Sequence, residues 1–80
     1  FKVASKRNKY LGQWVSEKLK YDSEKENEYI QEVIKADFQE AGDEDVFRKI
    51  KVDLKGHNIS DEEIRNKMKE LYEKAKSDFI

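Results

Sequence analysis

The stretch Ala36–Lys49, with the sequence ADFQEAGDEDVFRK, decides the fold because one helix ends and the next begins within it. Gly42 supplies the left-handed residue that commonly follows a helix, so we expect it to have a structural role. The carboxylates of Asp43, Glu44 and Asp45 then lie where a new helix exposes unpaired amide groups. A connection this short holds the two flanking helices close together and roughly antiparallel.

Apolar residues recur at spacings of three, four and seven along most of the chain, which is typical of amphipathic helices. This pattern predicts four helices, over residues 2–20, 23–41, 44–55 and 61–79. Because short turns join them, the sequence predicts one all-α domain, an antiparallel four-helix bundle. We expect its core to form around Trp14, Phe38, Phe47, Met68 and Tyr72.

Several polar or small residues indicate helix boundaries and close contacts between helices. Ser60 with Glu63 is typical of a capping box at the start of the last helix, and Ser23 with Glu26 predicts a second one. Gly12 lies inside the first helix, where glycine costs about 1 kcal/mol relative to alanine. Its presence indicates either a close approach of another helix or a break in the first one.

Charged side chains also fall on the apolar faces. At 100° per residue, Arg7 lies near the centre of the apolar arc of the first helix, with Asn8 at its edge, and Asp37 lies within the stripe of the second helix. A carboxylate there needs a partner, so we expect Asp37 to pair with Arg7, with Arg48 and Arg65 as competitors. The alternative is that Arg7 contacts a partner protein.

The composition argues against several classes of function. Seventeen basic and 18 acidic residues are interleaved, giving a net charge of −1, so we expect no nucleic-acid partner and a monomer when the protein is free. No apolar run approaches the ~20 residues that span a bilayer, so membrane insertion is not expected.

With no cysteine, a single histidine at His57 and no glycine-rich phosphate loop, we expect no metal, no cofactor and no catalytic residues. Gly42 precedes the acidic residues, which excludes an EF-hand loop.

Three segments closely resemble the zeta-subunit ATPase inhibitors of alphaproteobacterial rotary ATP synthases. They are RNKYLGQWVSEKL at residues 7–19, VIKADFQEAGDEDVFRKI at residues 33–50 and SDEEIRNKM at residues 60–68. The resemblance implies a regulatory four-helix subunit, not an enzyme, that contacts the alpha, beta and rotor subunits of the catalytic head. It implies inhibition of ATP hydrolysis by mechanical obstruction, and a cytoplasmic location, peripheral on the membrane-bound enzyme.

In that family a flexible segment ahead of the bundle becomes helical on binding and wedges into the catalytic head. Phe1 resembles the junction between this segment and the bundle, so we expect residues 1–80 to dock but to inhibit poorly. Next to that junction we expect partner contacts from Phe1, Lys2, Lys6 and Arg7. Glu44 and Arg48 match a family signature and are further candidates for partner contact.

Without the resemblance, the sequence indicates a helical protein–protein interaction module of unknown partner. A small nucleotide-sensing domain is a third hypothesis, although no phosphate-binding motif supports it.

Overall fold

The computed structural model describes residues 2–38 and 43–79. Within them the chain forms the helices α1 (Lys2–Leu19), α2 (Ser23–Asp37), α3 (Glu44–Asp53) and α4 (Asp61–Ser77), without a strand. The predicted all-α four-helix fold is confirmed. None of these described helices is both long and apolar enough to cross a membrane.

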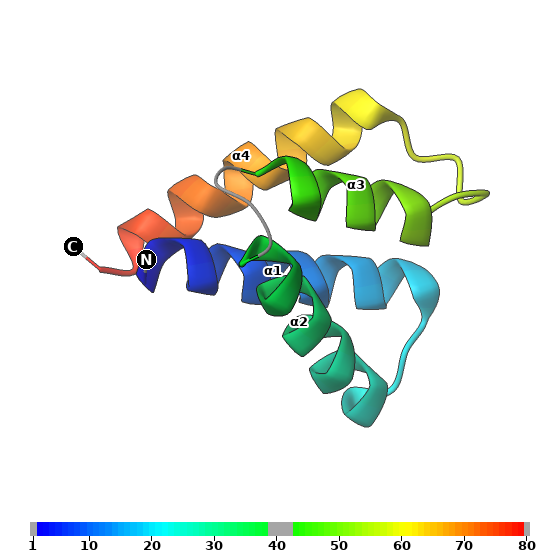
Figure 1. The fold of residues 1–80 in the computed structure, drawn as a ribbon, viewed down its shortest axis with the longest axis horizontal. Coiled ribbons are helices and arrows are strands. Elements are labelled where there is room, and N and C mark those ends of the chain that lie inside the picture. Colours follow the sequence, from blue (N-terminus) through cyan, green and yellow to red (C-terminus); the bar gives the residue numbers. More distant parts are fainter. Residues whose placement is uncertain (1, 39–42, 80) are drawn as a thin grey trace.

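The helices follow one another around the bundle. α1 packs against α2 and α4, and α3 closes the arrangement by packing against both α2 and α4. α1 and α3 run in one direction and α2 and α4 return, so that the amino and carboxyl ends of the chain lie at the same end of the molecule (Figure 1).

The helix boundaries differ slightly from the predicted ranges. α1, α3 and α4 end one or two residues earlier than predicted. α2 ends at Asp37 and Phe38 lies in a turn, whereas the prediction continued the helix to residue 41. Gly42, which was expected to end the helix, lies outside the described residues, as does Phe1.

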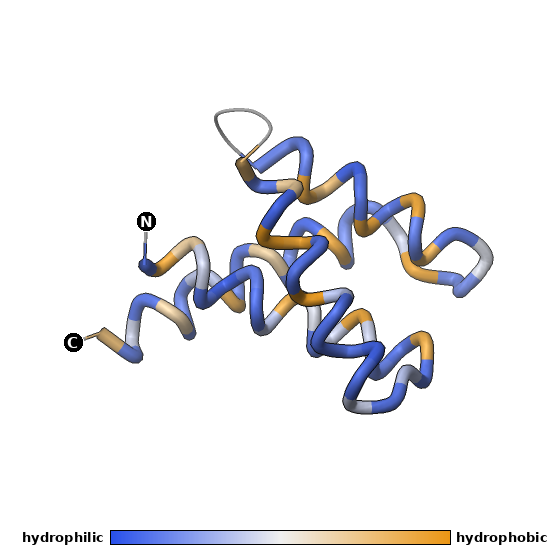
Figure 2. Tube along the Cα trace, turned by 60° about the horizontal axis from the view of Figure 1, so that its bottom comes forward, coloured by the Kyte–Doolittle hydropathy of each residue, from blue (hydrophilic) through white to orange (hydrophobic). Residues whose placement is uncertain are grey.

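The core is formed by one apolar stripe from each helix, visible as recurring hydrophobic segments along the chain (Figure 2). Phe47 and Met68 lie in it, at 7% and 6% exposure, and Trp14 packs against it half-buried. The buried apolar residues are Leu11, Val15, Tyr29, Ile30, Val33, Val46, Phe47, Ile50, Leu54, Ile64, Met68, Leu71 and Ala75.

Two aromatic residues expected in the core do not lie there. Phe38 is 65% exposed and lies in the turn after Asp37, beyond the end of α2 and of its buried stripe. Tyr72 is 39% exposed and lies at the edge of the α4 stripe. Tyr29, which the sequence prediction omitted, takes an aromatic position in the core instead.

Local hydrogen bonds explain where the helices begin and end. The hydroxyl of Ser60 accepts a hydrogen bond from the Glu63 amide at 3.1 Å and so caps α4. α2 is capped by Asp22, whose carboxylate accepts from the Lys25 amide at 2.9 Å, and not by Ser23 as predicted. Asp22 precedes Ser23 and already has the extended backbone that a capping residue needs.

The end of α1 has the hydrogen bonds of a Schellman motif. Lys20 adopts the left-handed conformation with φ of 59°, and its amide donates to the Glu17 carbonyl. The amide of Tyr21 donates to the Ser16 carbonyl at 2.9 Å. These two bonds satisfy carbonyl groups that the helix end would leave unpaired and turn the chain towards α2.

α1 and α2 approach each other closely at Gly12. A Cβ atom at this position would lie 2.6 Å from Ile30 Cγ1 and 3.0 Å from Ile30 Cα. The second of these distances is to backbone, which cannot move without shifting the whole helix. Gly12 therefore permits a close helix approach, and α1 continues through it without a break.

We predict that Gly12→Ala destabilises the protein. The overpacking cost of about 1–3 kcal/mol exceeds the ~1 kcal/mol that alanine gains over glycine in a helix. Urea unfolding followed by circular dichroism measures the change. In an Ile30→Ala background the same substitution should cost less, because the contact with Cγ1 is gone; an increase in stability from Gly12→Ala alone would contradict the close-approach explanation.

Candidate functional site

A buried ionic cluster joins α1 to both sides of the connection between α2 and α3. Arg7 is 1% exposed, with Nη1 2.9 Å from Asp43 Oδ1 and Nη2 3.5 Å from Asp37 Oδ1. Arg7 Nε donates to Asn8 Oδ1 at 2.9 Å, and Asn8 Nδ2 donates to Asp37 Oδ2 at 3.1 Å. One arginine therefore holds the end of α2 and the start of α3 against α1.

The two carboxylates contribute unequally to this cluster. Asp43 is the nearer to Arg7, but its side chain is 59% exposed and water screens the attraction. The side chain of Asp37 is 19% exposed and also accepts from Asn8, so it compensates more of the cost of removing the guanidinium from water. That cost amounts to several kcal/mol per buried ion and is offset only by well-placed partners.

The cluster includes the predicted Arg7–Asp37 pair and adds two features that the sequence did not reveal. Asn8, expected at the edge of the apolar arc, is 1% exposed and links the two charged groups. Asp43 precedes α3 as its N-cap residue, but its side chain makes no capping hydrogen bond within the described structure and pairs with Arg7. Arg7 is 1% exposed and has intramolecular partners in Asp37 and Asp43, and the partner contact expected of it stays a prediction.

A second ion pair connects α3 to α4. Arg65 Nη1 lies 3.1 Å from Glu44 Oε1 and Nη2 lies 3.2 Å from Oε2, which is a bidentate pair. The guanidinium carbon of Arg65 also lies 3.7 Å from the centroid of the Phe47 ring. The hydrogen bonds from Arg65 lower the pKa of Glu44. Glu44 thus has an intramolecular partner, and its expected contact with another protein stays a prediction.

Arg48 has a local partner as well. Its guanidinium pairs with Asp45 one turn earlier on α3. The two arginines that competed for Asp37 in the sequence prediction therefore both pair with acidic residues of the α3 amino end. The partner contact expected of Arg48 also stays a prediction.

A third polar cluster links α2 to α3. The Tyr29 hydroxyl donates to Asp53 Oδ2 at 2.7 Å, and Lys49 Nζ lies 3.2 Å from the same oxygen and 2.9 Å from Glu32 Oε1. Burial, together with the hydrogen bond to Asp53, raises the pKa of Tyr29 well above its ordinary value. Burial lowers the pKa of Lys49, but the bonds to Glu32 and Asp53 outweigh it and the net direction is upward. The positions of Glu32 and Asp53 in the sequence did not indicate that a tyrosine would join this cluster.

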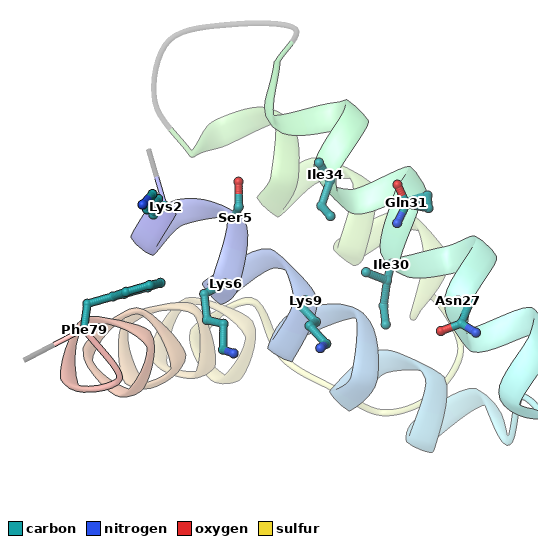
Figure 3. A pocket seen from close by; sticks show the side chains of 9 residues that line it. All are labelled: Lys2, Ser5, Lys6, Lys9, Asn27, Ile30, Gln31, Ile34 and Phe79. Carbon is teal, nitrogen blue, oxygen red and sulfur yellow. The ribbon is translucent and has the colours of Figure 1, made fainter.

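An open groove lies between the first turns of α1 and the middle of α2. Lys2, Lys6 and Lys9 border it from α1, and Ile30 and Ile34 project into it from α2 (Figure 3). The remaining residues that line it are Ser5, Asn27, Gln31 and Phe79. Two of the predicted partner-binding residues, Lys2 and Lys6, therefore meet in one groove, while Phe1 lies outside the described residues.

The chain offers little for catalysis or metal binding in its described part. Among residues 2–38 and 43–79 no group of three or more His, Cys, Asp or Glu side chains is placed to hold a metal ion. His57 is exposed in the turn after α3.

These features define a small four-helix protein whose paired charges join its helices and whose amino end carries a basic groove. The family model described as ATPase inhibitor subunit zeta matches residues 1–78, and the chain belongs to this family. The family predicted by resemblance is confirmed. The protein is therefore an ATPase inhibitor subunit that associates with the ATP synthase.

A solved structure supports the same fold. It is described as a solution NMR structure, is 44% identical in sequence to this chain and has a TM-score of 0.88. The similarity covers 99% of this chain and 92% of the other. The comparison with curated proteins gave no match.

We predict that Asp37→Asn destabilises the protein more than Asp43→Asn, although Asp43 lies closer to Arg7. Removing a partner from a buried ion costs about 3–5 kcal/mol, whereas an exposed pair contributes about 0–1 kcal/mol. Urea unfolding of both variants gives the two free energies. In the double variant Arg7→Met/Asp37→Asn the combined loss should be smaller than the sum of the single losses, because neither charge is left unpaired. Equal effects of Asp37→Asn and Asp43→Asn would contradict this ranking.

We predict that the Glu44–Arg65 pair stabilises the protein above the unfolded-state pKa of Glu44, about 4.3. Because the pKa of Glu44 is lowered in the folded protein, this contribution is lost as the pH falls through the folded-state value. Glu44→Gln should therefore lower stability at pH 6, and its difference from the wild type should shrink towards pH 3. Glu73→Gln, at an exposed position on α4, is the control and should show no such convergence.

Proposed function

We propose that this chain is the folded docking domain of the inhibitor, and that it binds the catalytic head of the rotary ATP synthase at its alpha, beta and rotor subunits. In this proposal ATP hydrolysis stops because rotation is obstructed, not because a chemical step is altered. The observation that carries the proposal is the family match over residues 1–78.

Charge placement at the amino end of α1 supports a docking role. Lys2 and Lys9 are exposed, and neither has an ion-pair partner among the described residues. The basic side chains of Lys49, Arg65 and Lys67 are each paired with a carboxylate. Other exposed lysines, such as Lys18 and Lys35, also lack an ion pair within the described residues, and Lys2 and Lys9 differ from them in bordering the same groove. Unpaired cations grouped at one site are available to a partner, whereas paired ones already serve the fold.

Mechanical inhibition places a thermodynamic requirement on this docking. A bound protein stops a rotary cycle only if it binds one rotational state more tightly than the others. Holding 99% of the enzyme in a state that otherwise holds 1% needs about 5.5 kcal/mol of differential affinity. Contacts that span both stationary and rotating subunits meet this requirement, because rotation breaks some of them.

We predict that residues 1–80 form a one-to-one complex with the purified catalytic head of an alphaproteobacterial ATP synthase. Native mass spectrometry measures the complex, and an ATP hydrolysis assay at saturating protein measures its effect. We expect binding with only weak inhibition, in agreement with a docking role. No complex would contradict the proposed function, and strong inhibition by these residues would contradict the assignment of docking alone.

A further inference from the structure

The groove between α1 and α2 differs chemically from two other grooves in the described part of the chain. The groove beside α4 contains Asp43 together with Arg7 and Arg65, and the groove at the α3–α4 turn contains Asp61. The described residues that line the α1–α2 groove include three lysines and no carboxylate. Its positive charge is therefore not neutralised within its own walls.

The three lysines form a row rather than a cluster around one point. Lys2, Lys6 and Lys9 are separated by four and three residues, which places them on one face of α1. At a rise of 1.5 Å per residue the row extends about 10 Å along the helix. A single phosphate or carboxylate cannot contact a row of this length, whereas several carboxylates along one segment can.

The floor of the groove is apolar. Ile30 and Ile34 project from α2 towards α1, and Phe79 lies beside the first turn of α1 just beyond the end of α4 (Figure 3). Phe79 is 52% exposed, which is unusual for a phenylalanine held against a folded surface.

Phe79 is held near the groove by its neighbour. The Tyr10 hydroxyl donates a hydrogen bond to the carboxylate of Asp78, and this bond raises the pKa of Tyr10. Lys6 and Lys74 lie over the Tyr10 ring, at 5.7 Å and 4.5 Å from its centroid. These contacts fix the end of α4 against α1. Asp78 makes no ion pair with Lys2, Lys6 or Lys9 within the described part of the chain, and its carboxylate accepts from Tyr10 instead.

We propose that this groove binds an acidic amphipathic segment of the catalytic head, with an apolar side chain on Ile30, Ile34 and Phe79 and carboxylates along Lys2, Lys6 and Lys9. The inference rests on the proposed function and names the surface and the partner chemistry that serve it. Charge complementarity selects an acidic segment, and the apolar floor selects a protein over a small anion.

The test compares two variants with equal changes in charge. Lys2→Glu/Lys9→Glu reverses the groove, and Lys18→Glu/Lys35→Glu reverses two exposed lysines that line none of the three grooves. A third variant, Phe79→Ser, removes apolar floor without altering charge. Surface plasmon resonance measures binding of each to the purified catalytic head at two salt concentrations, and circular dichroism verifies folding. Vesicles of phosphatidylcholine and phosphatidylglycerol and inorganic phosphate serve as alternative probes.

We expect Lys2→Glu/Lys9→Glu to weaken binding to the head at least about tenfold and to reduce its salt dependence, as reversal of complementary charges does. Phe79→Ser should weaken binding with unchanged salt dependence, and the control should stay within about threefold of the wild type. Equal binding of the groove variant and the wild type, or equal loss in the control, overturns the groove and leaves the proposed function standing. The groove proposal is also overturned if Lys2→Glu/Lys9→Glu reduces binding to vesicles or phosphate but does not change binding to the head. Absence of binding by the wild type overturns both.

Discussion

The buried guanidinium of Arg7 is the constraint on which the arrangement of the helices depends. It is 1% exposed, and a charge so far from water is tolerated only when oppositely charged and hydrogen-bonding groups surround it. These groups come from α1 itself, from the last residue of α2 and from the residue before α3. The end of α2 and the start of α3 must therefore both lie against the first half of α1. Apolar packing alone specifies this position less strictly, because hydrophobic contacts are not directional.

The sequence was sufficient to predict the features that depend on local spacing. Ser60 caps α4 because a capping residue needs only its own turn, and Gly12 could be recognised because a glycine within a helix has a cost that packing must offset. The Arg7–Asp37 pair was also accessible, since a charged residue in the middle of an apolar stripe needs a partner and few candidates exist.

Features that depend on how helices rotate against each other were not predictable from one sequence. The apolar pattern of α2 fits a buried stripe through Ile34 and Phe38 nearly as well as one through Tyr29 and Val33. A rotation by a few tens of degrees decides between them, and it follows from contacts with other helices. The same holds for Asp43, whose carboxylate lies beside Arg7 and not on the α3 amide groups. For Glu44 and Arg48, the sequence could not show that each has an intramolecular partner.

The amino end of α1 has one face that is held by contacts with other helices and one face whose charges do not stabilise the helix. The first turn of α1 contains no acidic residue, and Lys2 lies where the positive end of the helix dipole disfavours a cation. Tertiary contacts one to two turns later hold this half of α1 instead. Arg7 pairs with Asp37 of α2, and the Tyr10 hydroxyl donates to Asp78, the residue after α4. Lys2, Lys6 and Lys9 border the groove from the same part of α1 (Figure 3). Local and global preferences usually agree in a folded domain, and positions where they conflict are expected at functional sites. The lysines at the start of α1 are unfavourable for the helix itself, and the contacts of Arg7 and Tyr10 with other helices compensate for this cost.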